Sequence, residues 1–272
     1  MKNILLMIDL SAKKDNVSQY AMKLAQQLKS NIVLSYIIDE IGGDYAQALS
    51  ELEKLKADLE NSFKPEDHKS FITCLVEKGN FTSAVQGLVK DLHIELIVMG
   101  AADGKNDTGF LFGSKVRDIV DKVNCPILLI PEQVMFQGIK NILYVTDIRY
   151  SASEIVTQLA ALAEPLNVQV SILHVCADGL PDLADETIND LFTDVISPGI
   201  RQRLRVYKAS KKNPAEPVIG QLIANGKQGI LAIAHRKQHF FDHLFTDTPT
   251  KEAAIYKQLP ILLMPAHFFS NP

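Results

Sequence analysis

Several residues that could bind phosphate lie together in one glycine-rich loop. A buried run ends in Met99-Gly100, Gly104 follows in a polar stretch, and Gly113-Ser114 opens an expected helix. Glycines let a backbone approach a ligand closely, and the free N–H groups at a helix N-terminus favour an anion. The loop therefore predicts a phosphate site. Glycine turns with Ser114 as an ordinary N-cap would account for the same residues without a ligand, and this alternative stays open.

A carboxylate and a hydroxyl follow the first apolar run of the chain. Asp9 and Ser11 come directly after residues 4–8. In open α/β sheets, ligands bind beyond the carboxyl ends of the strands, at the point where the strand order reverses. We therefore expect the loop after residues 4–8 and the loop after residues 96–99 to face the same site.

The second half of the chain repeats the first. The segment KNILLMID at residues 2–9 returns as KNILYVTD at residues 140–147, and CPILLIP at residues 125–131 returns as LPILLMP at residues 259–265. A repeat of this length decides the domain organisation, because each copy is then one folding unit. Gly138 interrupts the apolar pattern between the copies, so we expect domains at residues 1–138 and 139–272.

Strand-like and helix-like periods alternate within the first copy. Between short apolar runs, apolar residues recur at three- and four-residue steps, which puts them on one face of a helix. Strands joined by helices make right-handed crossovers and form a parallel sheet that is covered on both faces. The sequence therefore predicts an α/β fold of two tandem, doubly wound domains with five-stranded parallel sheets. The expected strands are residues 4–8, 31–38, 71–76, 96–99 and 126–130, and the expected helices lie around residues 17–28, 49–59, 85–92 and 116–123.

The composition is that of a folded, water-soluble protein. Of 272 residues, 47% are hydrophobic and 22% are charged, and no apolar run approaches the roughly 20 residues that a membrane-spanning helix needs. A net charge of −4 gives no general attraction to nucleic acid or to anionic membranes. We expect a cytoplasmic protein with neither as a partner. Cys74, Cys125 and Cys176 lie in apolar stretches outside any C-x-x-C pattern, which predicts buried thiols.

The glycine-rich loop resembles that of the universal stress protein family, whose nucleotide-binding members carry G-x2-G-x9-G-[ST]. Here the pattern is Gly100-x3-Gly104-x8-Gly113-Ser114, so the outer spacing is kept and the middle glycine is displaced by one position. Further matching features are Asp9 with Ser11, residues 35–37 at the usual Leu-His-Val position, and the closing residues 125–128. The resemblance covers both halves. It implies a tandem member with the adenine nucleotide alpha hydrolase-like fold, whose halves pack as a pseudo-dimer with their closing strands adjacent.

The resemblance also implies a role for each site residue. Asp9 would contact the adenosine portion of ATP or a related adenine nucleotide, and the backbone at Ile37 would meet the adenine edge. The other residues would surround the ribose and the phosphates: Met99, Gly100, Gly104, Gly113, the Ser114 hydroxyl and the backbone N–H of Lys115. Two positions depart from the family. Leu10 stands where many nucleotide-binding members have glycine, and the carboxylate of Asp103, at the middle-glycine position, could repel phosphate or help to hold Mg²⁺.

The second copy lacks this pattern. Ala234 stands where the repeat has Gly100, and Asp247-Thr248 stands where it has Gly113-Ser114. Asp247 places its own anion at a helix start, where it would oppose a phosphate. Asp147 corresponds to Asp9, but we interpret it as a lone strand-end carboxylate. The second copy is therefore expected to be a degenerate domain with a structural or partner-binding role.

Three histidines in the second copy have a spacing that could suit zinc. His235, His239 and His243 would share one face if this segment were helical. No other residue supplies the missing ligand, so the favoured interpretation is a polar loop anchored by neighbouring phenylalanines, and no metal site is assigned.

The function implied is that of a stress-response regulator or sensor that binds ATP, with Mg²⁺ as a candidate companion ion, and acts on an unidentified protein partner. No residue set resembles a strong catalytic base beside the phosphates, so any ATP hydrolysis would be slow. One alternative is a ligand-free interaction protein of the same family. Another, a nucleotidyl-transferring enzyme, lacks a catalytic motif. A homodimer of the whole chain also stays open.

Overall fold

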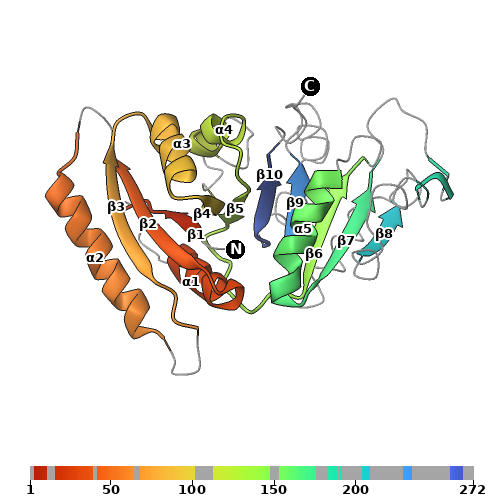
Figure 1. The fold of residues 1–272 in the computed structure, drawn as a ribbon, viewed down its shortest axis with the longest axis horizontal. Coiled ribbons are helices and arrows are strands. Elements are labelled where there is room, and N and C mark those ends of the chain that lie inside the picture. Colours follow the sequence, from red (N-terminus) through yellow and green to blue (C-terminus); the bar gives the residue numbers. More distant parts are fainter. Residues whose placement is uncertain are drawn as a thin grey trace. The chain divides into compact units, whose positions relative to one another are not determined.

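The computed structural model divides the chain into two compact units, Met1–Phe136 (unit 1) and Gln137–Pro272 (unit 2) (Figure 1). It describes residues 3–10, 16–38, 42–63, 68–101, 113–147, 153–175, 183–184, 186–188, 190, 204–208, 229–234 and 258–265, and the fold is reported for these residues. Within them, no helix is long and apolar enough to cross a lipid bilayer.

Unit 1 contains a parallel sheet in the order β3-β2-β1-β4-β5. Its strands are β1 (Asn3–Met7), β2 (Asn31–Ile38), β3 (Ile72–Lys78), β4 (Ile94–Gly100) and β5 (Ile127–Ile130). The central strands β1 and β4 are apolar almost throughout because helices cover both faces of the sheet. Ile4 pairs with Ile32 on one side and with Leu96 on the other, and all three side chains are buried.

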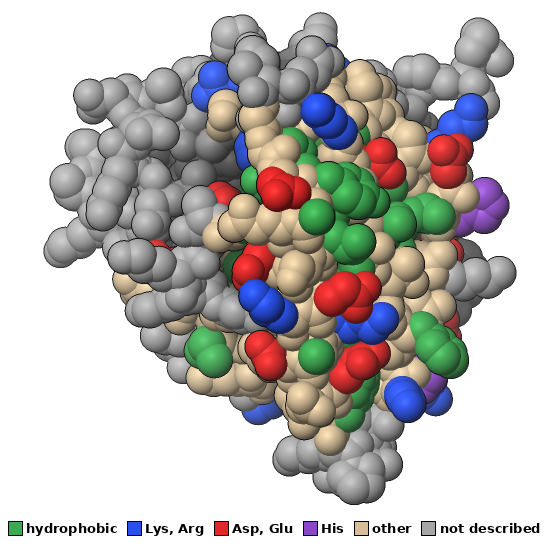
Figure 2. Space-filling model, turned by 90° about the vertical axis from the view of Figure 1, so that its left-hand side faces the viewer, with side chains coloured by type: hydrophobic (Ala, Val, Ile, Leu, Met, Phe, Trp, Pro, Cys, Tyr) green, Lys and Arg blue, Asp and Glu red, His purple; other side chains and the backbone are tan. Residues whose placement is uncertain are grey.

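Four helices connect these strands: α1 (Asn16–Leu28), α2 (Tyr45–Asn61), α3 (Phe81–Asp91) and α4 (Gly113–Val120). Two of them begin at side-chain N-caps, because the Asp44 carboxylate accepts from the N–H of Ala46 and the Asn80 amide oxygen accepts from that of Ser83. Helix α1 packs against α2, and α3 against α4. Figure 2 shows an outer face on which hydrophobic side chains lie among acidic and basic ones.

Unit 2 has the equivalent strand order, β8-β7-β6-β9-β10, again with parallel pairing. Its described elements are β6 (Asn141–Thr146), α5 (Ser153–Leu166), β7 (Gln169–His174), β8 (Leu204–Lys208), β9 (Gly229–Ala234) and β10 (Ile261–Met264). The predicted α/β fold with parallel strands is confirmed.

The sequence repeat is visible in the backbone geometry of both units. The turn that follows the first helix of each unit contains a left-handed residue, Lys29 (φ 52°) in unit 1 and Asn167 (φ 53°) in unit 2. The next residue donates back to the helix in the same way, from Ser30 N to Ala25 O and from Val168 N to Ala163 O. The two copies therefore end this helix through the same local structure.

The cysteines differ in burial. Cys125 is buried, and burial raises the pKa of its thiol to about 12. Cys74 is half-buried on β3, where burial, assisted by the nearby Glu53 carboxylate, raises its pKa to about 11. Both are free thiols, so the prediction of burial is met fully at Cys125 and partly at Cys74. Cys176 lies outside the described residues.

Candidate functional site

The strand order of unit 1 reverses between β1 and β4. The chain passes from β1 outward to β2 and β3, then crosses to β4 and β5 on the opposite side of β1. The loops that leave β1 and β4 therefore diverge from neighbouring strands, which is where open α/β sheets bind ligands. The reversal between the first and fourth strands agrees with the sequence prediction, whereas the expectation that the two loops face one site stays a prediction.

Asp9 stands just beyond the hydrogen-bonded end of β1. Ile8 N donates to Ser35 O at 2.9 Å, which extends the pairing of β1 with β2 by one residue beyond Met7. Asp9 is the next residue, and it is exposed. Ile37 lies two residues after Ser35 on β2 with its side chain buried, so its backbone, rather than its side chain, is the part that could meet a ligand.

Met99 and Gly100 are the last two residues of β4. The register of β1 and β4, with Leu6 opposite Val98, brings these residues to the same edge of the sheet as Asp9. Met99 is buried, whereas Gly100 is exposed. A Cβ at Gly100 would lie 3.5 Å from Val17 Cγ2 of α1, which is an ordinary van der Waals distance. The fold itself therefore does not require glycine here.

Helix α4 begins at Gly113 and turns its polar residues away from the core. Val116, Ile119 and Val120 are buried. Ser114 and Lys115 are exposed in the first turn, where free N–H groups favour an anion. The Lys115 Nζ lies 5.4 Å from the centroid of the Phe81 ring on α3, a cation–π contact that holds the ammonium group near this helix start. Gly104 and Asp103 lie outside the described residues, so their predicted roles stay predictions.

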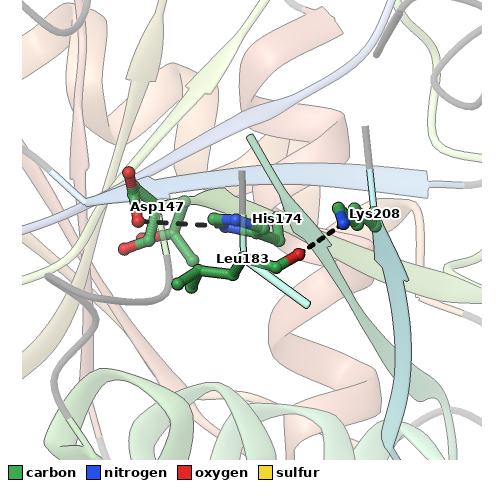
Figure 3. A network of polar contacts seen from close by, with 5 residues as sticks. Asp147, His174, Leu183 and Lys208 are labelled. Carbon is green, nitrogen blue, oxygen red and sulfur yellow. Dashed lines mark hydrogen bonds and ion pairs between the residues drawn. The ribbon is translucent and has the colours of Figure 1, made fainter. Parts of the chain in front are cut away.

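In unit 2 the equivalent strand end is organised differently. Asp147, which follows β6, is buried, and its Oδ1 lies 3.9 Å from Nδ1 of His174 at the end of β7 (Figure 3). The His174 side chain is fully buried. The interpretation of Asp147 as a lone carboxylate is therefore wrong, because the repeat places it beside a strand that ends in histidine. The sequence contains a signal for this pair, since Asp147 repeats the position of Asp9 and a buried histidine ends the strand that pairs with β6.

A second polar contact continues this row of strand ends. Lys208, the last residue of β8, pairs with His174 across the sheet. Its Nζ donates to the carbonyl oxygen of Leu183 (Figure 3). Polar residues at the ends of β6, β7 and β8 thus contact other groups of unit 2.

The remaining expectations for unit 2 fall largely outside the described residues. Ala234 is the last residue of β9, at the position equivalent to the end of β4. The pair Asp247-Thr248 and the histidine segment at residues 235–243 are not among the described residues. Within the described part of the chain, no three His, Cys, Asp or Glu side chains gather as metal ligands.

Comparison with known families decides the identity of the N-terminal half. The profile of the Universal stress protein family matches residues 1–131, which span β1 to β5 and the site described above. These residues belong to the universal stress protein family. The match ends close to the boundary of unit 1. The search of curated proteins found no match to this chain.

Solved structures extend the similarity of fold to the whole chain. A universal stress protein from Archaeoglobus fulgidus DSM 4304 shares 14% sequence identity, with a TM-score of 0.63 over 97% of this chain and 96% of that chain. A functionally unknown protein from Pseudomonas aeruginosa PAO1 shares 12% identity, with a TM-score of 0.58 over 97% of this chain and 92% of that chain. The universal stress protein fold thus covers both units.

Proposed function

We propose that this protein binds ATP or a related adenine nucleotide in its N-terminal universal stress protein domain and acts as a stress-response regulator or sensor. Unit 2 is a degenerate copy with a structural role or a role in binding a protein partner.

The exposed strand ends at the switch point of unit 1 carry the proposal. Asp9 follows β1, the side-chain-free Gly100 ends the neighbouring β4, and both are open to solvent. A carboxylate accepts hydrogen bonds from ribose hydroxyls, and a glycine backbone permits close approach of a ligand. Since the fold tolerates a Cβ at Gly100, its absence is better explained by a ligand than by packing.

The start of α4 suits the phosphates. Gly113, the exposed Ser114 hydroxyl and the backbone N–H of Lys115 belong to its first turn. Together with the helix dipole and the Lys115 ammonium group, they supply the hydrogen-bond donors and positive charge that a phosphate chain requires. Mg²⁺, when bound with ATP, would neutralise part of the phosphate charge.

Unit 2 presents a different surface chemistry at the equivalent position. Asp147 is buried against His174, whereas Asp9 is exposed. An internally engaged carboxylate is not available to a ribose, and Ala234 replaces the glycine at the neighbouring strand end. These differences support a single nucleotide site in each chain.

Binding rather than rapid turnover is the proposed activity. The described histidines of unit 1, His68 and His93, precede β3 and β4, so they lie toward the amino ends of the strands and away from the proposed site. Fast hydrolysis needs a base or a water-positioning residue beside the phosphates. We therefore propose that any ATP hydrolysis is slow.

The test begins with the purified full-length chain. Mass spectrometry of small molecules released on denaturation identifies any nucleotide that copurifies, and calorimetric titration with Mg·ATP measures the affinity. The absence of both a released nucleotide and binding heat would favour the alternative, a ligand-free interaction protein of the same family.

Gly113→Asp locates the site within unit 1. The new carboxylate favours the start of α4 through the helix dipole, so the fold should persist, but it opposes a phosphate. We expect Mg·ATP binding to be lost. Gly87→Asp, the same change at a position on α3 where a Cβ meets none of the described residues within 4 Å, is the matched control and should bind normally. If Gly113→Asp bound Mg·ATP as tightly as Gly87→Asp and the unmodified chain do, the phosphates would have to bind elsewhere.

A further inference from the structure

The first residue of α1 is anchored to the segment that leaves unit 1. Asn16 is buried, and its Nδ2 donates to Pro131 O at 3.0 Å and to Val134 O at 3.1 Å. The two carbonyls belong to one turn, which is closed by a hydrogen bond from Val134 N to Pro131 O. A primary amide has two N–H donors, so the Asn16 amide uses its full donor capacity on this turn.

A second contact fixes the same segment one helical turn later. The ring of Phe136 meets the ring of Tyr20 edge to face, with centroids 4.9 Å apart and an interplanar angle of 81°. Val134 is buried, whereas Met135, between Val134 and Phe136, is 59% exposed. Residues 131–136, called the exit segment here, thus lie along α1 and end at the last residue of unit 1.

The start of α1 also borders the proposed nucleotide site. Val17, the neighbour of Asn16, places its Cγ2 3.5 Å from the position of a Cβ on Gly100. The end of β4 is tied in turn to the end of β5, because Ala101 N donates to Ile130 O at 2.9 Å, immediately before the exit segment. Asn16 and Val17 therefore contact the exit segment and the site edge from adjacent positions.

From this arrangement we propose that Asn16 is a positioning residue that couples nucleotide occupancy in unit 1 to the conformation of the exit segment. The inference rests on the proposed nucleotide-binding function. A ligand held between the ends of β1 and β4 restrains the first turn of α1, and the Asn16 amide passes that restraint to residues 131–136. Coupling between two sites is reciprocal, so loosening the exit segment also weakens nucleotide binding.

A tryptophan reporter reads the exit segment directly. The chain contains no tryptophan, so Phe136→Trp introduces a single fluorophore at the ring that contacts Tyr20. We expect titration with Mg·ATP to change the emission of Trp at position 136, with saturation at the concentration given by calorimetry. Phe71→Trp is the matched control, because it makes the same change at an exposed side chain that precedes β3 and lies outside the exit segment, so its emission should not respond to nucleotide.

Removing the amide tests the link. Asn16→Ala, made in the full-length chain with and without the reporter, should weaken Mg·ATP binding about fivefold, a factor within the net loss expected for its two hydrogen bonds, and should suppress the reporter response. Asn3→Ala is the control. It removes a side-chain amide that likewise donates to a backbone carbonyl, that of Leu92, at the opposite end of β1 from the proposed site, and it should change neither quantity.

The outcomes separate this inference from the function beneath it. ATP binding with a silent reporter, or an unchanged affinity in Asn16→Ala, would overturn the coupling and leave the nucleotide site in place. Absence of ATP binding in the unmodified chain would overturn the proposed function and this inference with it. The reporter requires no change at Asn16, so the coupling is tested even where Asn16→Ala does not fold.

Discussion

Individual residues separate features that the fold requires from features that we propose for ligand binding. Lys29 and Asn167 occupy the same left-handed turn in both units although their side chains differ, so this position is structural. Gly100 has no such conformational requirement, and among the described residues a Cβ there would meet only Val17. We propose that its lack of a side chain serves the close approach of a ligand to the end of β4.

Gly100→Ala should therefore separate binding from stability. We expect the midpoint of thermal unfolding to stay nearly unchanged, because the added methyl group makes an ordinary contact, and the free energy of unfolding to shift by less than about 1 kcal/mol. Affinity for Mg·ATP should fall at least tenfold, or about 1.4 kcal/mol. Calorimetry and thermal unfolding on the same preparation measure both. Gly87→Ala should leave binding unchanged, and a Gly100→Ala chain that bound ATP normally would contradict the proposed close approach.

At the level of the elements, the sequence predicts most of the fold because buried strands and amphipathic helices have different periods. The run at residues 71–76 appears as β3 shifted by one or two residues, and the strand order reverses between β1 and β4, the two strands after which the sequence predicted the site. The anchoring role of Asn16 could not be predicted. Its partners are the backbone carbonyls of Pro131 and Val134. Every residue has a backbone carbonyl, so the residue types do not indicate which ones accept from Asn16.

The Asp147–His174 pair is an element-scale feature, because it joins the ends of β6 and β7 in the interior of unit 2. His174→Gln should destabilise this unit by about 1–3 kcal/mol, since the fully buried imidazole is lost and the polar groups beside it lose a partner. Hydrogen exchange resolved along the chain should show faster exchange in β6 and β7 and little change in β1 and β2. His68→Gln, at an exposed position in unit 1, is the control.

The double variant tests whether the two side chains act together. If Asp147 and His174 interact directly, the combination of Asp147→Asn with His174→Gln should destabilise unit 2 by less than the sum of the single changes. Strict additivity would show that each side chain contributes to stability through other partners.

The whole molecule contains two units with one strand order and one intact set of proposed site residues. Fold similarity to solved structures extends over 97% of the chain, whereas the family profile ends at residue 131. The pseudo-dimer packing of the halves stays a prediction from the repeat. We propose that the second copy keeps the fold without the features that would admit a nucleotide.

A single site in unit 1 predicts a stoichiometry of one nucleotide per chain. Restoring glycines in unit 2 should not raise this stoichiometry to two. Ala234→Gly with Asp247→Gly removes a methyl group and a charge, and the relieved repulsion at the helix start expected from the sequence is worth at most about 2 kcal/mol. Micromolar binding requires about −8 kcal/mol in total. Asp147 would still be buried against His174 rather than facing a ribose.

Combining this double change with Gly113→Asp removes the site of unit 1, so titration with labelled ATP then reports unit 2 alone. We expect no binding in the combined variant, and a stoichiometry of one there would show that unit 2 lacks only its glycines.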